Sequence, residues 1–503
     1  MALAAALAAG VSARAQDPGG ARLPLVSARI DSGPIVGVVH ETANVFRDIP
    51  FAAPPVGLLR WAPPQPVAPW TAPRETAYPG PSCPQPMNAN GAPNSGGANG
   101  AQSEDCLQLN VFAPKAAKGA PVMVWIHGGG HQTGAGSIYD GQAFARDGVV
   151  VVTINYRLGA LGYFAHPAIT KAAGGQPTGN FGLMDQIAAL KWVQRNIAAF
   201  GGDPKNVTVF GESAGGMSTL ALLATPSAKG LYQKAIVESG AGWFKPTTLA
   251  AKEQEGAAAL AAIGVPETAA IDDLRAIPVE KLVAIDAEYG PFTDGKLMTE
   301  TPSQALARGH AADVPLIIGS NSGEDSLLGP AKATSASFAR LGVTDAMKAA
   351  YPADAGDDDR LARAMFTDRF MGGPARWVAA QASGGQPAWL YHFSYVGGRF
   401  RPAMTRATHA AEIQYVWEYW GRRTPMSVVT DEDKAMAALM HACWVSFAKT
   451  GTPVCGSTAW PAYDPRTDRL MEFGASSGVR TNFRKVQLDA QQTAALPSLK
   501  LAK

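Results

Sequence analysis

The sequence predicts an α/β protein, in which apolar strands alternate with amphipathic helices along the chain. Residues 182–200 (GLMDQIAALKWVQRNIAAF) carry apolar side chains at three- and four-residue steps, which is typical of a helix with one buried face. Short apolar runs with the composition of buried strands lie on either side of this helix. These runs are 121–126 (PVMVWI), 149–155 (VVVVTIN), 206–210 (NVTVF), 234–238 (KAIVE) and 314–319 (VPLIIG).

We expect the mature chain to form a single domain at 16–503. No internal repeat and no long Pro- or Ser-rich linker divides it. Segments 247–286 and 331–386 are Ala-rich and helical in pattern, without clear strands. We therefore interpret them as helical insertions on the sheet rather than as separate domains.

The first fifteen residues predict a signal peptide. An apolar run from Met1 to Ala13 is followed by Ala13-Arg14-Ala15, which has the small-x-small form of a cleavage site. The run is too short for a bilayer, which needs about 20 residues. No later apolar run has the length of a membrane span. The prediction is an exported protein, periplasmic or secreted, with no membrane span.

Composition argues against several partners. The 43 basic and 41 acidic side chains give a net charge of +2, so a concentrated basic face for nucleic acid is not expected. The cysteine and histidine spacings do not match a zinc site, and we expect neither a metal nor a cofactor. Cys83 and Cys106 bracket a Pro-, Asn- and Gly-rich segment and suit a disulfide. Cys443 and Cys455 form a second disulfide or remain two buried thiols.

The strongest chemical signal is Gly211-Glu212-Ser213-Ala214-Gly215. It is a G-x-S-x-G motif that directly follows the predicted strand 206–210 and precedes a helical run at 216–223. This strand–turn–helix context is the one in which such a serine is exposed as a nucleophile. The helix N-terminus behind it stabilises developing negative charge. We therefore predict Ser213 as the nucleophile of an acyl-transfer reaction.

A second glycine-rich motif predicts donors for the oxyanion that such a reaction creates. His127-Gly128-Gly129-Gly130 directly follows the predicted strand 121–126. Residues without side chains let backbone N–H groups approach a substrate oxygen closely. We assign the oxyanion hole to the N–H groups of Gly129, Gly130 and Ala214. His127 is interpreted as a structural residue.

The base and the acid are less well defined by the residues themselves. In hydrolases with this motif the chain order is serine, acid, histidine. The histidines after Ser213 are His310, His392, His409 and His441. His409 is favoured by its place in a loop-like stretch, because His310 suits a surface turn, His392 a strand and His441 a helix.

The acid is expected after a strand and before the histidine. Glu324 and Asp325 both follow the predicted strand 314–319, and the chemistry of an imidazole partner suits either of them. Asp294, in Thr293-Asp294-Gly295, is better explained as a turn residue.

Longer motifs resemble the type-B carboxylesterases, the family that includes the cholinesterases. Residues 200–216 (FGGDPKNVTVFGESAGG) are similar to the serine signature of that family, and 104–112 (EDCLQLNVF) to its second signature. Further similar stretches lie at 49–61, 155–164 and 180–186, and the resemblance covers roughly residues 28–485.

The resemblance implies an α/β-hydrolase fold with a central mixed, mostly parallel sheet, flanking helices and helical insertions over the active site. It implies Glu324 rather than Asp325 as the acid and His409 as the base. It further implies that Ser239 and Glu412 hold the triad residues in position without contacting the substrate, and that Cys83 pairs with Cys106. One departure is Arg406, because the family commonly has glycine three residues before the histidine.

These observations predict a serine carboxylic-ester hydrolase that acts on a small-molecule ester through an acyl-enzyme on Ser213. Hydrolysis of carbamates or amides, or acyl transfer to another alcohol, would use the same residues and is the alternative. A non-catalytic adhesion protein on this fold is disfavoured, because the whole predicted triad is retained.

Overall fold

The structure is a computed structural model that describes residues 23–330, 332, 338, 341–421 and 424–501. The expected signal peptide at 1–15 therefore lies outside the described residues. The chain divides into two compact units, Met1–Val207 with Glu253–Tyr289 and Thr208–Lys252 with Gly290–Lys503. Strand β8 (Gly202–Glu212) begins in the first unit and ends in the second.

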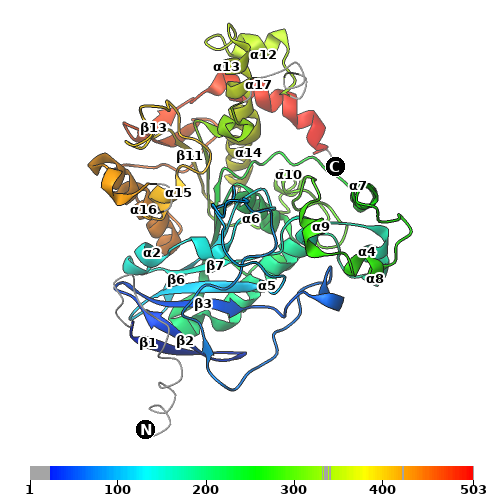
Figure 1. The fold of residues 1–503 in the computed structure, drawn as a ribbon. Coiled ribbons are helices and arrows are strands. Elements are labelled where there is room, and N and C mark those ends of the chain that lie inside the picture. Colours follow the sequence, from blue (N-terminus) through cyan, green and yellow to red (C-terminus); the bar gives the residue numbers. More distant parts are fainter. Residues whose placement is uncertain (1–22, 331, 333–337, 339–340, 422–423, 502–503) are drawn as a thin grey trace. The chain divides into compact units, whose positions relative to one another are not determined.

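The first unit carries a mixed set of strands in the order β1-β2-β3-β5-β7-β6, with β4 beside β2. Figure 1 shows β1, β2, β3, β6 and β7 of this set. Neighbours along this order are antiparallel, except that β6 and β7 are parallel. Strands β6 and β7 confirm the predicted strands at 121–126 and 149–155. The strands are β1 (Leu25–Ile30), β2 (Gly33–Val39), β3 (Ala43–Pro50), β4 (Arg74–Glu75), β5 (Gln108–Pro114), β6 (Ala120–Ile126) and β7 (Val150–Ile154).

The amphipathic helix predicted at 182–200 is α5 (Phe181–Asn196), followed by a 3-10 turn at Ile197–Phe200. Its predicted apolar positions are buried, so the three- and four-residue spacing identifies its buried face. The predicted helical segment 247–286 contains α7, α8 and α9. The other helices in this part of the chain are α2 (Gln142–Arg146), α3 (Gly159–Gly162), α4 (Pro167–Ala172), α7 (Leu249–Ala262), α8 (Ile271–Arg275) and α9 (Val279–Val283).

The second unit carries parallel strands in the order β8-β9-β10-β11-β12, and β13 is antiparallel to β12. Glu212, the last residue of β8, pairs with Glu238, the last residue of β9. Strand β10 extends further along the sheet than β9 and ends at Asn321, which pairs with Phe393. Because the carboxyl ends of parallel strands meet at one edge, the residues that follow β8, β9 and β10 gather there. Beyond β8, these strands are β9 (Lys234–Glu238), β10 (Leu316–Asn321), β11 (Ala388–Phe393), β12 (Arg469–Phe473) and β13 (Gly478–Thr481).

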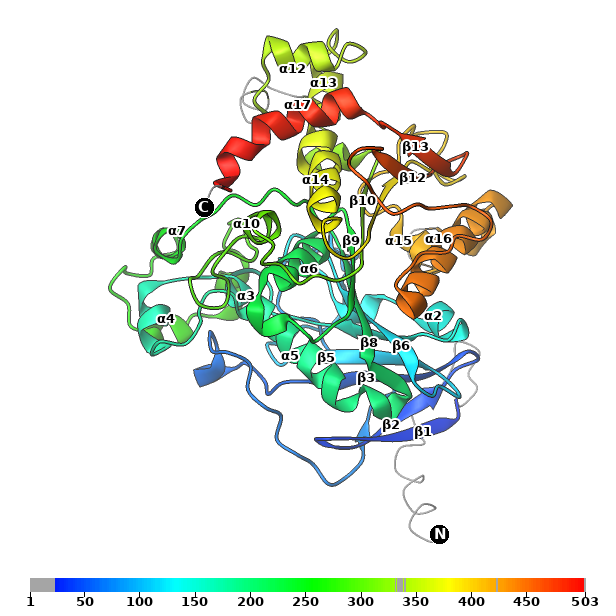
Figure 2. The ribbon, with the colours of Figure 1, turned by 180° about the vertical axis from the view of Figure 1, so that it is seen from behind.

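The second unit also contains the longest helix, α16, among the residues described. Strand β10 begins two residues later than the predicted run at 314–319, because Pro315 cannot donate a ladder hydrogen bond. Figures 1 and 2 show α17 crossing beside α12 and α14. The helices are α6 (Ala214–Ala224), α10 (Pro302–Ala307), α12 (Asp345–Ala350), α13 (Asp358–Thr367), α14 (Gly373–Ala382), α15 (Ile413–Val416), α16 (Asp431–Thr450) and α17 (Lys485–Ala495).

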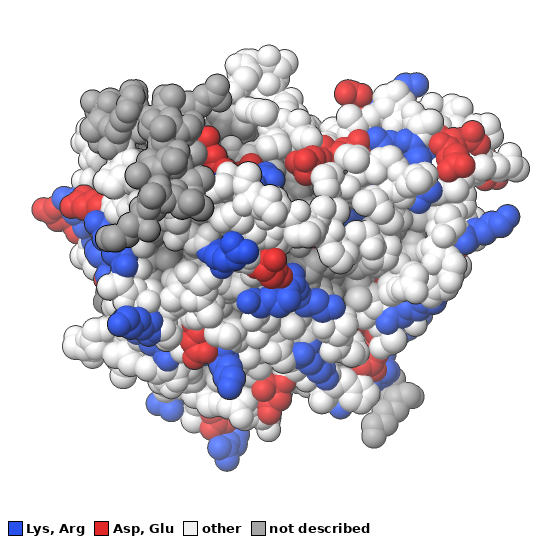
Figure 3. Space-filling view, turned by 90° about the horizontal axis from the view of Figure 1, so that it is seen from below, with Lys and Arg blue, Asp and Glu red and all other residues white. Residues whose placement is uncertain are grey.

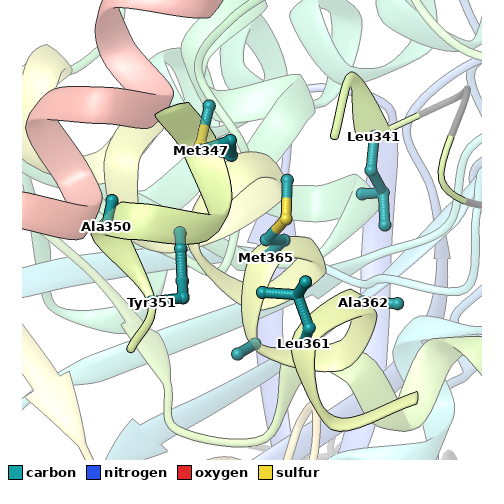
Figure 4. Packing of buried hydrophobic residues seen from close by; sticks show 8 residues of the cluster. Leu341, Met347, Ala350, Tyr351, Leu361, Ala362 and Met365 are labelled. Carbon is teal, nitrogen blue, oxygen red and sulfur yellow. The ribbon is translucent and has the colours of Figure 1, made fainter. Parts of the chain in front are cut away.

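Helices α12, α13 and α14 occupy the described part of the helical segment predicted at 331–386; residues 331, 333–337 and 339–340 lie outside it. Figure 4 shows how α12 and α13 pack. Met347 from α12 and Tyr351, the residue after that helix, meet Leu361 and Met365 from α13, and all four side chains are buried. This small apolar cluster gives the predicted insertion a core of its own.

Both cysteine pairs are disulfides: Cys83 with Cys106 in the first unit and Cys443 with Cys455 in the second. The surface in Figure 3 is mostly uncharged, with Lys and Arg interspersed among Asp and Glu. That distribution agrees with the small net charge. Within the described residues, the helices do not combine the length and the apolar character that a bilayer crossing requires.

Candidate active site

Ser213 occupies the turn between β8 and α6. Its backbone has φ +56° and ψ −121°, a conformation that is unfavourable for a residue with a side chain. Its N–H donates to the carbonyl of Glu238 at 2.8 Å, which ties the turn to the end of β9. A Cβ on Gly216 would lie 2.8 Å from Cα of Gly240, so close packing of α6 requires glycine there. The predicted strand–turn–helix context of Ser213 is confirmed.

His409 and Glu324 are joined by a hydrogen bond, although 85 residues separate them. His409 Nδ1 lies 2.5 Å from Glu324 Oε2. Glu324 follows β10 in a 3-10 turn at Glu324–Leu328 and is fully buried, whereas the His409 side chain is 11% exposed. The imidazole thus lies near the surface, and a buried carboxylate fixes its orientation by a hydrogen bond.

The other candidates have different partners. The exposed His310 pairs with Glu300 at 2.8 Å, and the buried His441 has Nδ1 2.7 Å from the carbonyl of Val416. The ring of His392 packs 4.6 Å from that of Phe483. Asp294 caps its own turn, because Oδ1 accepts from the N–H groups of Lys296, Leu297 and Met298 at 2.8, 2.7 and 3.1 Å. Asp325 binds arginines instead of a histidine.

A second carboxylate meets the opposite nitrogen of His409. Glu212 Oε1 lies 3.1 Å from His409 Nε2, and the Glu212 side chain is 4% exposed. Among the described residues, Ser213 Oγ has no hydrogen-bond partner. In this structure Nε2 of His409 therefore contacts Glu212 and is not bonded to Ser213. The imidazole is thus held between two buried carboxylates.

Ser239 and Asn321 fix the second oxygen of Glu324. Ser239 Oγ donates to Glu324 Oε1 at 2.6 Å, and the Asn321 N–H donates to the same oxygen at 2.7 Å. Ser239 itself adopts φ +49°, just after β9. Glu412 does not bond to Glu324 directly: its Oε2 accepts a hydrogen bond from the Asn321 side-chain amide. Ser239 therefore contacts the carboxylate directly, while Glu412 acts through Asn321.

The loop that carries Glu324 is joined to the loop that carries His409 by backbone and side-chain hydrogen bonds. The Gly323 N–H donates to the carbonyl of Ala407 at 2.7 Å, and the Ala407 N–H donates to Ser322 Oγ at 2.9 Å. The His409 N–H donates to Ser326 Oγ at 2.9 Å. Arg406, at the position where the resembled family commonly has glycine, adds an ion pair with Asp325 at 2.9 Å.

Buried negative charge determines the ionisation of this cluster. Burial lowers the pKa of His409, but Glu212, Glu324 and Glu412 together raise it to about 10. Burial also favours the neutral form of Glu324, yet His409 brings the pKa of Glu324 below its usual value. Burial and repulsion by Glu212 and Glu324 raise the pKa of Glu412 to about 8. The imidazolium and Glu324 carboxylate therefore stabilise each other, while Glu412 favours its proton.

Glu238 extends the same cluster. It is fully buried at the end of β9, and its Oε1 accepts from the indole N–H of Trp444 at 2.8 Å. Burial and repulsion by Glu412 raise the pKa of Glu238 well above its usual value. Like charges cannot all be ionised at close range in a dry interior, so some of these glutamates hold protons at neutral pH.

The predicted oxyanion loop follows β6 in the first unit. Gly129 and Gly130 have φ +103° and +63°, and a Cβ on Gly129 would lie 2.2 Å from the carbonyl of Thr133. His127 is buried against Tyr156, whose hydroxyl donates to the His127 carbonyl at 2.7 Å. Burial lowers the pKa of His127 to about 4, so this ring is neutral. In the second unit, Ala214 is the first residue of α6, whose N–H has no partner within the helix.

Comparison with known proteins decides the family. Residues 24–491 match the carboxylesterase family. The para-nitrobenzyl esterase of Bacillus subtilis is 39% identical over 464 residues, which cover 86% of this chain and 92% of that protein. This chain belongs to the carboxylesterase family. The resemblance inferred from the sequence motifs is therefore confirmed, and the protein is a carboxylic ester hydrolase.

Other relatives of this carboxylesterase support the same conclusion. The fumonisin B1 esterase of Sphingopyxis macrogoltabida is 37% identical over 487 residues, 90% of this chain and 87% of that protein. A PNB esterase structure has a TM-score of 0.81 at 35% identity and covers 92% of this chain and 99% of that one. A Geobacillus stearothermophilus carboxylesterase structure has a TM-score of 0.80 at 31% identity, covering 93% of this chain and 99% of that one. The predicted α/β-hydrolase fold is confirmed.

Sequence reasoning missed Glu212, Glu238 and Asn321 in this carboxylesterase. Glu212 occupies a variable position of the G-x-S-x-G motif, so the motif itself did not identify it. An acidic residue directly before the serine was the available signal. Glu238 and Asn321 lie at the ends of β9 and β10, and only the parallel pairing of these strands brings them to the site.

Proposed function

We propose that this carboxylesterase hydrolyses its ester through a Ser213–His409–Glu324 triad and an acyl-enzyme. The observation that carries the proposal is the hydrogen bond between His409 Nδ1 and the buried Glu324, which fixes the imidazole. In the neutral form of His409, Nε2 can take a proton. Ser213 contributes the strained turn at the end of β8 that G-x-S-x-G nucleophiles occupy.

The reaction consists of two acyl transfers. Ser213 Oγ attacks the ester carbonyl as His409 Nε2 takes the hydroxyl proton, and the same proton is then given to the departing alcohol. Water, deprotonated by His409, next releases the acid from Ser213. The hydrogen bond between Ser213 and His409 forms with substrate in place, as catalytic hydrogen bonds commonly tighten only in the substrate complex.

We assign stabilisation of the oxyanion to the N–H groups of Gly129, Gly130 and Ala214. Positive φ at both glycines and the free first N–H of α6 support the assignment. Loss of a single such donor typically costs about 10²–10³ in turnover.

The decisive variant is Ser213→Ala. We expect kcat on a p-nitrobenzyl or p-nitrophenyl ester to fall by about 10⁴-fold or more, with the fold retained by circular dichroism. Ser498→Ala removes a hydroxyl from the C-terminal 3-10 turn and should keep full activity. A Ser213→Ala enzyme that keeps its activity would disprove the mechanism. In the unmodified enzyme, mass spectrometry should locate an organophosphate adduct on Ser213.

We also propose that the protein is exported. Its two disulfides are typical of proteins that mature in an oxidising compartment. Cell fractionation should recover the active enzyme from the periplasm or the medium. An active enzyme confined to the reducing cytosol, with four reduced thiols, would contradict export.

A further inference from the structure

A cavity of about 240 Å³ lies in the second unit, beside the loop that carries His409. Phe400 and Met404 form part of its apolar wall, and Thr408 and Ala411 place it next to His409 along the chain. A dry cavity of about 150 Å³ already holds benzene. This cavity therefore has room for an aromatic ring with a short aliphatic chain.

Arg406 is the charged side chain among the residues that line this cavity. Its Nη2 donates to Asp325 Oδ2 at 2.9 Å, and its side chain is 41% exposed. Within the described part of the chain, Nε and Nη1 of Arg406 make no hydrogen bond. A guanidinium presents five donors in one plane, so Arg406 can hold Asp325 and still bind a ligand carboxylate.

Further positive charge borders the cavity. Arg401 Nη2 donates to the hydroxyl of Tyr395 at 3.0 Å, and its guanidinium lies 5.4 Å from the centre of that lining ring. The Arg399 guanidinium lies 5.6 Å from the centre of the Phe400 ring. Three arginines thus stand between positions 399 and 406, a segment without acidic residues.

The acids packed against this segment are already engaged. Asp433 accepts from the hydroxyl of Tyr395 at 3.0 Å and from the N–H of Gly398 at 3.1 Å. Asp325 binds both Arg406 and Arg363. Asp325 is therefore paired with two arginines, and the negative charge of Asp433 is stabilised by hydroxyl and backbone donors. Arg406 retains donors for a further anion.

We infer that this cavity binds small amphiphilic carboxylates, with the apolar body against Phe400 and Met404 and the carboxylate on Arg406. The inference goes beyond the triad, because it concerns a binding site that the Ser213 chemistry does not require. Such a ligand has two sources: the acid that the enzyme itself releases, or an acid that reaches the cavity independently of turnover.

The probe is 4-phenylbutyrate, matched by the neutral 4-phenylbutan-1-ol, and binding is measured by calorimetry on the full chain. We expect the carboxylate to bind about tenfold or more tightly than the alcohol, because a charge-assisted hydrogen bond distinguishes them. Arg406→Gln should remove that preference, and Arg406→Lys should retain part of it. Arg466→Gln, which removes an exposed guanidinium paired with Asp464, should leave binding unchanged.

A second variant keeps the test valid if the glutamine substitution perturbs the loop. Phe400→Ala should weaken the carboxylate and the alcohol alike, because it removes part of the shared apolar wall. Inhibition of ester hydrolysis separates the two sources: competitive inhibition identifies the released acid, and non-competitive inhibition identifies an independent ligand. Both patterns support the site, provided that Arg406→Gln abolishes them.

The inference is overturned by any of three results. These are equal affinity for the carboxylate and the alcohol, unchanged carboxylate affinity in Arg406→Gln with native circular dichroism, or no saturable binding below about 10 mM. Calorimetry reports binding without turnover, so this failure is distinguishable from failure of the proposed triad. Conversely, an inactive Ser213→Ala enzyme should still bind 4-phenylbutyrate with the wild-type affinity.

Discussion

Glu212 Oε1 lies 3.1 Å from Nε2 of His409, on the opposite side of the imidazole from Glu324. Burial lowers the pKa of His409, and the negative charge of Glu212 is the largest of the influences that raise it. The residue directly before the proposed nucleophile thus controls the protonation of the proposed base.

Glu212→Gln should shift the pH dependence of catalysis. His409 must lose its proton to act as a base, so kcat/KM rises with pH through its ionisation. Removing the negative charge of Glu212 destabilises the imidazolium and lowers the pKa of His409. We expect the rising limb of kcat/KM to move to lower pH by about one pH unit or more. A pH-stat assay measures it, and the exposed Glu432→Gln is the control. An unmoved limb would contradict the electrostatic role of Glu212.

Glu412→Gln should stabilise the protein at alkaline pH. The folded-state pKa of Glu412, about 8, is higher than the 4.5 of an unperturbed glutamate. The folded state therefore binds the proton more tightly, and stability is lost as pH rises from about 4.5 through about 8. Glutamine is neutral throughout and can still accept from Asn321. We expect the thermal midpoint to rise by about 2 °C or more at pH 9 and to change little at pH 5.

The comparison at two pH values separates charge from packing. A merely structural effect of Glu412→Gln would change the midpoint equally at pH 5 and pH 9. If the variant is less stable than the wild type at pH 9, the ionised Glu412 is not the unfavourable group that its burial indicates.

Ser239→Ala should weaken the support of Glu324 without touching the substrate. The substitution removes the 2.6 Å hydrogen bond to Glu324 Oε1 and leaves the Asn321 N–H on that oxygen. We expect kcat to fall by about tenfold with little change in KM. Because the Ser239 hydroxyl lowers the pKa of Glu324, its loss leaves a more basic carboxylate that stabilises the imidazolium of His409 more strongly. The acidic limb of kcat, which His409 governs, should therefore also move to higher pH. An unchanged acidic limb with reduced kcat would indicate a packing defect instead.

Gly216→Ala should destabilise the second unit. The added methyl group would lie 2.8 Å from Gly240 Cα and 2.9 Å from the Glu238 carbonyl, both of which are backbone atoms. We expect the free energy of unfolding to fall by about 1–3 kcal/mol, as measured by urea denaturation. Gly356→Ala is the matched control, because its Cβ would have no neighbour within 4 Å. Equal stability of the two variants would show that α6 can move away from β9.

The features of local origin were predictable from the chain alone. Strand β9 lies at the predicted residues, and α5 differs from the predicted helix only in its tighter final turn. The serine turn also followed from its neighbours, because a strand run, two glycines and a helical run specify that geometry together. Strand β10 begins and ends two residues later than predicted, because strand boundaries depend on which backbone N–H groups form hydrogen bonds with a neighbouring strand.

The choice of acid and base was not local. Four histidines follow Ser213, and the residues themselves left Glu324 and Asp325 open; only the resemblance to a family selected among them. In the structure, the parallel register of β9, β10 and β11 and the hydrogen bonds between 321–326 and 406–409 bring Glu324 to His409. A sequence pattern does not record which loop ends meet at a sheet edge.

By itself, the sequence determined the fold class, the family, the proposed nucleophile on its turn and the cysteine pair at 83 and 106. The tertiary structure alone decided that His409 lies between Glu212 and Glu324, that Glu412 acts through Asn321, and that Arg406 lines a cavity. The reason is physical. Backbone conformation follows from neighbouring residues, whereas pKa values and charge pairing depend on burial and on contacts between residues that are distant in the chain.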